Sequence, residues 1–388
     1  MTREVVVVEA LRTPFTRAIK GSFKDTRPDT LAAEVIKAVL AKVPDLDPAQ
    51  VEDLVLGCAM PEGPQGLNVA RLAGLLAGLP NTVPGMTINR FCSSGSQSIA
   101  IAADRIAVGG IDVALAGGTE SMSQVPMGGN TPSASPELME LCPEAYISMG
   151  ATAENVARKF EVSREEQDAF ALESHRRAVE GWEKGFLAEE VVPVNTTVIT
   201  PGGVKEITVT KDEGPRPDSN IAGLAKLRPV FDPKGSVTAG NASPLTDGAA
   251  IALLADKDTA EKLGVTPLGY FRTHAVVGVG PEIMGIGPVP AIRKLMEKTN
   301  MSLDDIDAFE INEAFASQAA YCVRELGIDP AKVNPNGGAI AIGHPLGTTG
   351  ARQVATLLRH LKRTGGRYGV ISMCIGGGMG FAALVETY

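Results

Sequence analysis

Residues 89–96 read Asn89-Arg90-Phe91-Cys92-Ser93-Ser94-Gly95-Ser96 and place a cysteine where an extended run meets a small-residue helix expected over 93–108. A thiol at the start of a helix lies near free backbone N–H groups and the positive end of the helix dipole, which both favour the thiolate. We therefore expect the pKa of Cys92 to fall below its usual value of about 8.5. Because the thiolate is the nucleophilic form, Cys92 is a candidate for covalent catalysis, and a buried packing cysteine is the alternative.

Three motifs in the C-terminal third place further polar or reactive side chains beside glycines or at the ends of apolar runs. They read Asn312-Glu313-Ala314-Phe315, Gly343-His344-Pro345 and Cys374-Ile375-Gly376-Gly377-Gly378. Together with Cys92, an asparagine, a histidine and a second cysteine fit a thiol-activated acyl-transfer site. Each also has a structural interpretation, because Asn312 alone would cap a helix from Glu313 onward and His344 alone would satisfy a turn.

In this order the four motifs resemble those of the thiolase family, over essentially the whole chain. The resemblance is closest to the degradative 3-ketoacyl-CoA thiolases, through Ser148-Met149-Gly150-Ala151-Thr152-Ala153-Glu154-Asn155 and through residues 310–318. It implies an α/β fold of two similar halves, layered α/β/α/β/α and packed face to face, which would bring Cys92 and Cys374 to a shared centre. It also implies an inserted loop domain that covers the substrate.

The pattern of elements also suggests how the chain is divided. Strands that alternate with helices predict a mostly parallel layered sheet. At Thr119 the composition changes to a stretch rich in small residues, with four methionines up to residue 150 and no clean periodicity. We therefore assign 1–118 plus 246–265 to the N-terminal half, 119–245 to the inserted loop domain and 266–388 to the C-terminal half. No sequence identity between the halves proves a duplication.

Local patterns set the expected limits of several elements. They predict a helix over 30–43 capped by Asp29 and Thr30, a strand over 113–116 that ends at Gly117, a helical stretch over 153–185 with a capping box from Ser163 to Glu166, two strands within 191–210 and a helix over 313–326.

The resemblance implies a role for each motif residue. Cys92 would attack the 3-keto carbon of the thioester and become the acyl-enzyme, expelling the enolate of acetyl-CoA. His344 would take the Cys92 proton and help to hold the developing oxyanion, and Asn312 would anchor a water as the other donor. Cys374 would protonate the leaving enolate and then deprotonate incoming CoA. Without a Cβ, Gly376 would let backbone N–H groups approach the thioester oxygen closely.

The resemblance to thiolases also matches further residues of this chain to substrate contacts. Arg216 would meet the nucleotide end of CoA and Ser243 the pantetheine arm, with a solvated arginine and a loop serine as the alternative. Met284 and Phe315 would border the reacting centre, while Met149 would line either an adaptable acyl tunnel or ordinary core. Acetoacetyl-specific biosynthetic thiolases carry a histidine where this chain has Ser148, which favours a broader-chain degradative enzyme.

Composition excludes several other classes of protein. A formal net charge of -9 argues against nucleic acid as the main partner. The five cysteines are widely spaced without a Cys/His ligand pair, so we expect no metal, and no run is long and apolar enough for a membrane span. The N-terminus does not read as a signal peptide, and Val385 to Tyr388 contains no peroxisomal tripeptide, so the expected compartment is the cytoplasm.

The expected ligands and alternatives follow from the same resemblance. CoA and acyl-CoA act as substrates, no cofactor is bound tightly, and the chain forms a homodimer or homotetramer with a possible hydratase/dehydrogenase partner. A biosynthetic acetoacetyl-CoA thiolase would use the same four residues in reverse. A non-catalytic lipid-binding relative would be expected to lose a reactive cysteine or the histidine, and this chain keeps them. A reversible disulfide between Cys92 and Cys374 remains a third, regulatory reading.

Overall fold

Ten strands of the computed structural model, which describes residues 2–388, form one mixed sheet. Its order is β4-β3-β5-β8-β1-β9-β12-β11-β10, and β2 pairs with β8. The bounds are β1 Val5–Arg12, β2 Thr16–Arg17, β3 Asp53–Gly57, β4 Gly85–Ile88, β5 Val113–Ser121, β8 Thr246–Asp256, β9 Gly269–Gly278, β10 Ala308–Ile311, β11 Tyr368–Ile375 and β12 Met379–Thr387.

The sheet consists of two parts with the same plan. In one part β4, β3 and β5 are parallel, and β8 and then β1 follow antiparallel. In the other, β10 and β11 are parallel and β12 and then β9 follow antiparallel, while Val333 makes a parallel bridge to Phe309 at the place that β4 takes in the first part. Strands β1 and β9 join the parts through two residue pairs, Val6 with Tyr270 and Val7 with Gly269. The expected α/β fold of two similar halves is confirmed. The expected mostly parallel sheet is wrong, because among the strands of residues 2–388 only β4–β3, β3–β5 and β10–β11 pair in parallel and the other strand pairs are antiparallel.

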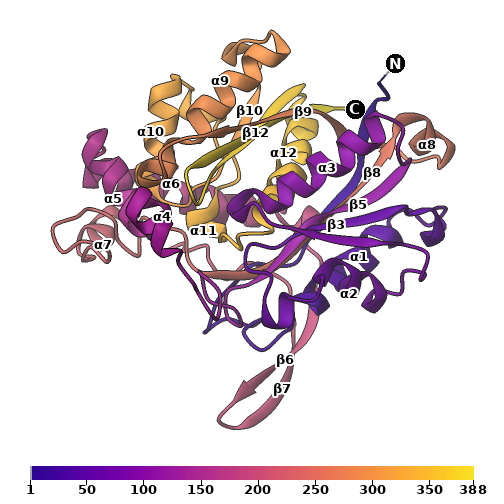
Figure 1. The fold of residues 1–388 in the computed structure, drawn as a ribbon, viewed down its shortest axis with the longest axis horizontal. Helices are drawn as coiled ribbons and strands as arrows, with labels where there is room; N and C mark the ends of the chain where they lie inside the picture. Colours follow the sequence, from indigo (N-terminus) through magenta and orange to yellow (C-terminus); the bar gives the residue numbers. More distant parts are fainter. Residues whose placement is uncertain (1) are drawn as a thin grey trace.

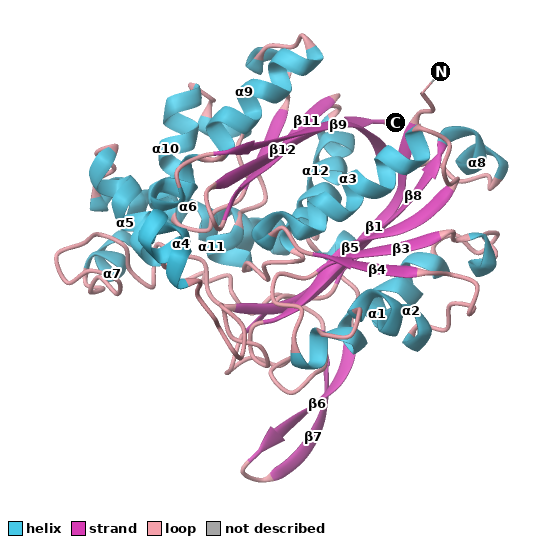
Figure 2. Cartoon of the chain, in the orientation of Figure 1, coloured by secondary structure: helices cyan, strands magenta, loops and turns pink. Residues whose placement is uncertain are grey.

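Helices lie outside and between the two parts of the sheet (Figures 1 and 2). Helix α1 (Pro28–Ala41) packs on β8 and β5, with α2 (Val69–Leu76) beside it, and α9 (Pro288–Thr299) packs on β12 and β9 at the opposite side. Between them, α3 (Ser94–Ala107) contacts α12 (Thr349–Thr364). The central layer is apolar: Ile99 and Ile106 of α3 share a buried cluster with Val354 and Leu357 of α12.

The segment between β5 and β8 covers one end of these layers. It contains α4 (Pro136–Leu141), α5 (Met149–Lys159), α6 (Arg164–Glu183), α7 (Ile221–Ala225) and the hairpin of β6 (Val194–Thr200) and β7 (Gly203–Val209), which projects from the body (Figure 1). The hairpin confirms the two strands expected within 191–210. The helical stretch expected over 153–185 is divided in two, because the chain breaks at Glu161, with a φ of 52°. The expected cap at Ser163 is confirmed, since its side chain accepts from Glu166 N at the start of α6.

Two other local features differ from expectation. Helix α1 begins at Pro28 with Arg27 as its N-cap, because proline presets the helical φ at the first position; Asp29 therefore lies inside the first turn. The second strand of the terminal hairpin, β12, was not expected. Among residues 2–388, no helix is long and apolar enough to cross a membrane.

Strand β5 runs to Ser121 rather than ending at Gly117. The strand continues because residues 117–121 pair with residues 247–251 of β8. Both positions require glycine, since a Cβ on Gly117 would lie 2.0 Å from Ala250 O and one on Gly118 would lie 1.9 Å from Gly347 O. The extension brings the end of β5 against the segment that carries His344.

Candidate active site

Cys92 lies in a short 3₁₀ turn, η3 (Phe91–Ser93), directly before α3. It is buried in an apolar cluster with Ala59, Met122 and Leu346. Burial raises the pKa of Cys92 to about 11, although the backbone N–H groups of Gly376 and of Cys92 itself act in the opposite direction. The expectation of a lowered pKa is therefore wrong: in this environment, loss of hydration outweighs the backbone donors.

His344 lies on the loop between α11 (Ala339–Ile342) and α12, and its ring is held at both nitrogens. Nδ1 is 2.6 Å from Thr349 Oγ1, whose hydroxyl donates to Pro345 O, so we assign the ring proton to Nδ1. Nε2 is then unprotonated and accepts a hydrogen bond from the Asn312 amide nitrogen at 3.3 Å. Burial, together with the charge of Arg352, lowers the pKa of His344 to about 3, so the ring is neutral near pH 7.

Asn312 directly follows β10 and is held beside His344 by its Nδ2. Its Oδ1 is buried and accepts no hydrogen bond within residues 2–388. The expected helix cap at Asn312 is wrong, because α10 (Ala316–Leu326) begins later, with Phe315 as its N-cap. The intervening residues are not helical because Phe315 makes an antiparallel bridge with Ala242.

Cys374 and Gly376 both lie close to Cys92. Cys374 is fully buried near the end of β11, and burial, followed by the proximity of Cys92, holds its pKa well above the usual value. The backbone N–H of Gly376 is directed to the Cys92 sulfur, and a Cβ on Gly376 would lie 3.5 Å from Met149 Sδ. Met149, Met284 and Phe315 share an apolar cluster with Cys374. The structure therefore gathers these residues around one centre where the two halves meet.

Ser243 and Arg216 lie on the side of this centre formed by the segment between β5 and β8. Ser243 donates from both its backbone N and its Oγ to Ala314 O, each at 3.0 Å, which holds it beside the Asn312 motif. The exposed Arg216 lines a cavity of about 140 Å³ that also includes Ala242 and Pro244, the chain neighbours of Ser243. Ser243 thus lies between this cavity and the Asn312 motif.

Two further residues of this cavity were missed from the sequence. Arg17 and His175 line it beside Arg216, and neither arginine forms an ion pair within the described part of the chain. Burial, Arg216 and Arg17 lower the pKa of His175 to about 4. The backbone N–H of Arg216 donates to His175 Nδ1 at 3.3 Å, which leaves the proton of the neutral ring on Nε2. The cavity therefore offers two cations and a neutral donor, a set that suits an anion.

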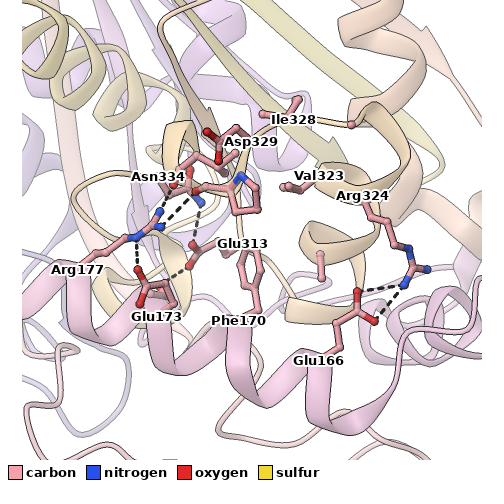
Figure 3. A pocket seen from close by; sticks show the side chains of 15 residues that line it. Glu166, Phe170, Glu173, Arg177, Glu313, Val323, Arg324, Ile328, Asp329 and Asn334 are labelled. Carbon is pink, nitrogen blue, oxygen red and sulfur yellow. Dashed lines mark hydrogen bonds and ion pairs between the residues drawn. The ribbon is translucent and has the colours of Figure 1, made fainter.

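A larger pocket, of about 710 Å³, lies between α6, α10 and residues 327–334 (Figure 3). Its wall includes Glu313, the residue after Asn312, whose carboxylate accepts hydrogen bonds from Ser174 Oγ and Asn334 Nδ2. Figure 3 shows ion pairs of Glu166 with Arg324 and of Glu173 with Arg177 at its rim. Both arginines of this pocket are thus already paired, unlike the arginines of the smaller cavity. Within residues 2–388, no group of three or more His, Cys, Asp or Glu side chains is placed to hold a metal ion.

Comparisons with solved structures give close matches over the whole chain. The dimeric peroxisomal thiolase of Saccharomyces cerevisiae has a TM-score of 0.91 and 42% identity, covering 100% of this chain and 98% of that one. The acetyl-CoA acetyltransferase of Bacillus anthracis also has a TM-score of 0.91, with 40% identity and coverage of 100% and 99%.

Sequence comparisons agree. The chain is 51% identical over 389 residues to the 3-ketoacyl-CoA thiolase of Bacillus subtilis (strain 168), covering 99% of each chain. It is 52% identical over 387 residues to the peroxisomal 3-ketoacyl-CoA thiolase of Homo sapiens, covering 99% of this chain and 91% of that one. The family models described as thiolase, N-terminal domain, and thiolase, C-terminal domain, match residues 5–258 and 265–387. The chain belongs to the thiolase family.

Proposed function

We propose that this protein cleaves 3-ketoacyl-CoA esters by thiolysis, releasing acetyl-CoA and an acyl-CoA two carbons shorter. The observation that carries the proposal is the convergence on Cys92 of the Gly376 N–H and Cys374. His344, on the loop before α12, and Asn312, after β10, form a hydrogen-bonded pair beside them. Relatives about half identical in sequence are named 3-ketoacyl-CoA thiolases, which supports the same substrate class.

In the first half-reaction, the Cys92 sulfur attacks the 3-keto carbon. The bond between this carbon and C2 of the ester then breaks, which leaves the acyl group on Cys92 and releases the enolate of acetyl-CoA. Because the pKa of Cys92 is raised to about 11, its sulfur is protonated at rest and needs a base. The unprotonated Nε2 of His344 takes that proton, directly or through a bridging water, and then becomes an N–H donor toward the developing oxyanion. The Asn312 Oδ1, buried without a partner in the described chain, suits a water that acts as the second donor.

Cys374 protonates the carbon of the leaving acetyl-CoA enolate. A thiol with a raised pKa is protonated near neutral pH and is suited to this step. In the second half-reaction the Cys374 thiolate takes the proton of incoming CoA, whose sulfur attacks the acyl group on Cys92. The Gly376 N–H holds the thioester oxygen in both half-reactions.

The cavity of Arg17, His175 and Arg216 is proposed to hold the phosphate-bearing end of CoA, and Ser243 the pantetheine arm next to it. Unpaired guanidinium groups suit phosphate because they donate in a planar fork. CoA acts here as a substrate, and no tightly bound cofactor is part of the proposal. Acetoacetyl-pantetheine, which lacks the phosphates, is expected to show a higher KM than acetoacetyl-CoA, and Arg17→Ala is expected to narrow that difference.

The direct test is to trap the acyl-enzyme. Protein mixed with a 3-ketoacyl-CoA ester without free CoA is digested and analysed by mass spectrometry. We expect the acyl group on the Cys92 peptide and none in Cys92→Ser, which keeps the size of the side chain but not its nucleophilicity. An acyl group that still forms on the Ser variant at another cysteine would refute the assignment of Cys92.

A second candidate is condensation of two acetyl-CoA molecules. The fold favours it as much as thiolysis of longer esters, since the Bacillus anthracis neighbour is an acetyl-CoA acetyltransferase. Thiolysis rates across chain length separate the two: faster turnover of longer 3-ketoacyl-CoA esters supports the degradative enzyme. Activity confined to acetoacetyl-CoA would support the biosynthetic one.

For assembly we propose a homodimer, because the Saccharomyces cerevisiae neighbour is dimeric. Light scattering on purified protein distinguishes it from a monomer or a tetramer. The cytoplasm stays our proposed compartment, although several relatives are named peroxisomal, and fractionation of the source cells tests it.

A further inference from the structure

Glu120 occupies in the N-terminal half the position that Cys374 occupies in the C-terminal half. The last pair between β3 and β5 is Gly57 with Gly118, and the last pair between β10 and β11 is Ile311 with Ser372. Two residues beyond these pairs, β5 carries Glu120 and β11 carries Cys374. The repeated sheet thus directs a carboxylate, as well as the second thiol, toward the region where the halves meet.

The Glu120 carboxylate is 1% exposed and binds donors from three separate segments. Its oxygens accept from Ala59 N at 2.7 Å, Met60 N at 3.2 Å and Gln65 Nε2 at 2.6 Å, all beyond the end of β3. They also accept from Gly347 N at 2.8 Å, and the Cys58 thiol lies at 3.6 Å. Through Gly347, which follows His344 by three residues, Glu120 ties the His344 loop to the N-terminal half.

The charge of Glu120 is held only by neutral donors. No lysine or arginine nitrogen forms an ion pair with it within residues 2–388, whereas the buried Glu310 pairs with Arg352. An unpaired carboxylate in a buried site acts on its neighbours with little screening. Ala59, whose N–H it accepts, belongs to the same apolar cluster as Cys92, so the negative charge stands next to that cluster.

We propose that Glu120 is a positioning residue of this site, which holds the His344 loop in place and, by its unpaired charge, keeps Cys92 in the thiol form until His344 accepts the proton. Cys374 from β11 acts on Cys92 by its proximity, while Cys58 after β3 and the loop that carries His344 contact Glu120. Burial favours the neutral form of Cys374, Cys58 and His344. Burial raises the pKa of Glu120 as well, but its four N–H donors act in the opposite direction and favour the carboxylate. The charge of Glu120 adds to burial in raising the pKa of Cys92.

Alkylation of Cys92 by iodoacetamide measures this effect without any substrate. In Glu120→Gln, the pH midpoint of Cys92 alkylation, read by peptide mass spectrometry, is expected to fall by about 1 unit, as on removal of a neighbouring like charge. The matched control is Glu154→Gln, since Glu154 is also buried and held by neutral donors, Ser236 N and Val237 N, but is not among the groups that shift the pKa of Cys92. An unchanged or higher midpoint in Glu120→Gln, or an equal shift in the control, overturns the proposal.

Steady-state kinetics test the hold on the His344 loop. This arm rests on the proposed thiolysis, and we expect Glu120→Gln to lower kcat about 10- to 100-fold with little change in KM, as for a displaced catalytic group. If that variant does not fold, Glu120→Asp is used instead. The shorter side chain keeps the negative charge but moves it away from the Gly347 N–H. The pH midpoint of Cys92 alkylation should then stay near the wild-type value while kcat falls. Wild-type kcat in either folded variant overturns the positioning role. If the wild-type protein catalyses no thiolysis, the proposed function is refuted instead. The alkylation experiment still tests the effect of Glu120 on Cys92, because it needs no substrate.

Discussion

At the scale of single residues, burial decides the protonation states of this site. Cys92 and His344 are both buried, and loss of hydration moves their pKa values in opposite directions, to about 11 and about 3. Both groups are therefore neutral at pH 7, and proton transfer between them creates charge in a site that has hydrogen-bond donors ready. The Gly376 N–H and the Asn312 amide are those donors, and His344 Nε2 joins them once it has taken the proton.

His175 gives a prediction about stability at this scale. Its pKa is lowered to about 4 in the fold, whereas the unfolded chain has a histidine pKa near 6.5, so between these pH values only the unfolded chain binds the proton. Each unit of falling pH in this window costs about 1.4 kcal/mol of unfolding free energy. The free energy of unfolding, measured with urea, should therefore fall between pH 6.5 and pH 5. We expect this fall to be smaller in His175→Gln than in the wild type. Parallel losses in the two proteins would contradict the buried, neutral ring.

At the scale of elements, close backbone contacts hold the reacting segments in register. Strand β5 approaches Gly347 of the His344 loop so closely that Gly118 has no room for a Cβ. The same strand carries Glu120, which accepts from the Gly347 N–H. One strand end thus positions the loop by shape and by hydrogen bonding together.

Replacing Gly118 by alanine tests this contact. The new Cβ would lie 1.9 Å from Gly347 O, so strand and loop must separate, at a cost of about 1–3 kcal/mol for overpacking. We expect a lower urea midpoint together with lower kcat. The control is Gly202→Ala in the β6–β7 turn, where the nearest atom to a new Cβ is 3.7 Å away and no loss is expected. Equal stability of the two variants would show that the contact is not tight.

At the scale of the whole molecule, the two halves share a core rather than only a site. Residues of α3 and α12 pack in one buried cluster with residues of both parts of the sheet. Since β1 and β9 are joined by only two pairs, the central helices provide most of the contact between the halves.

This shared core predicts cooperative unfolding. Scanning calorimetry should show one transition for the chain. Leu357→Ala, which truncates a fully buried side chain of α12, should shift that whole transition to lower temperature and reduce the free energy of unfolding by about 2–5 kcal/mol. Two separated transitions, with only one shifted by the variant, would mean that the halves fold independently.

The amino-acid sequence by itself determined the reactive side chains, the alternation of strands and helices, and the family. Those features depend on residue type and spacing over short stretches, which is why the two strands within 191–210 and the cap at Ser163 could be predicted. The expected helix cap at Asn312 and the single helix over 153–185 failed because a bridge to Ala242 and a break at Glu161 overrode local propensity.

Only the tertiary structure decided the environment of those side chains. The raised pKa of Cys92 follows from its burial, the cavity of Arg17 and His175 from segments far apart in the chain, and the place of Glu120 from the repeated sheet. The physical reason is that hydration and electric fields depend on what surrounds a group in space. Local sequence states which groups are present, and packing sets whether they are charged and what they face.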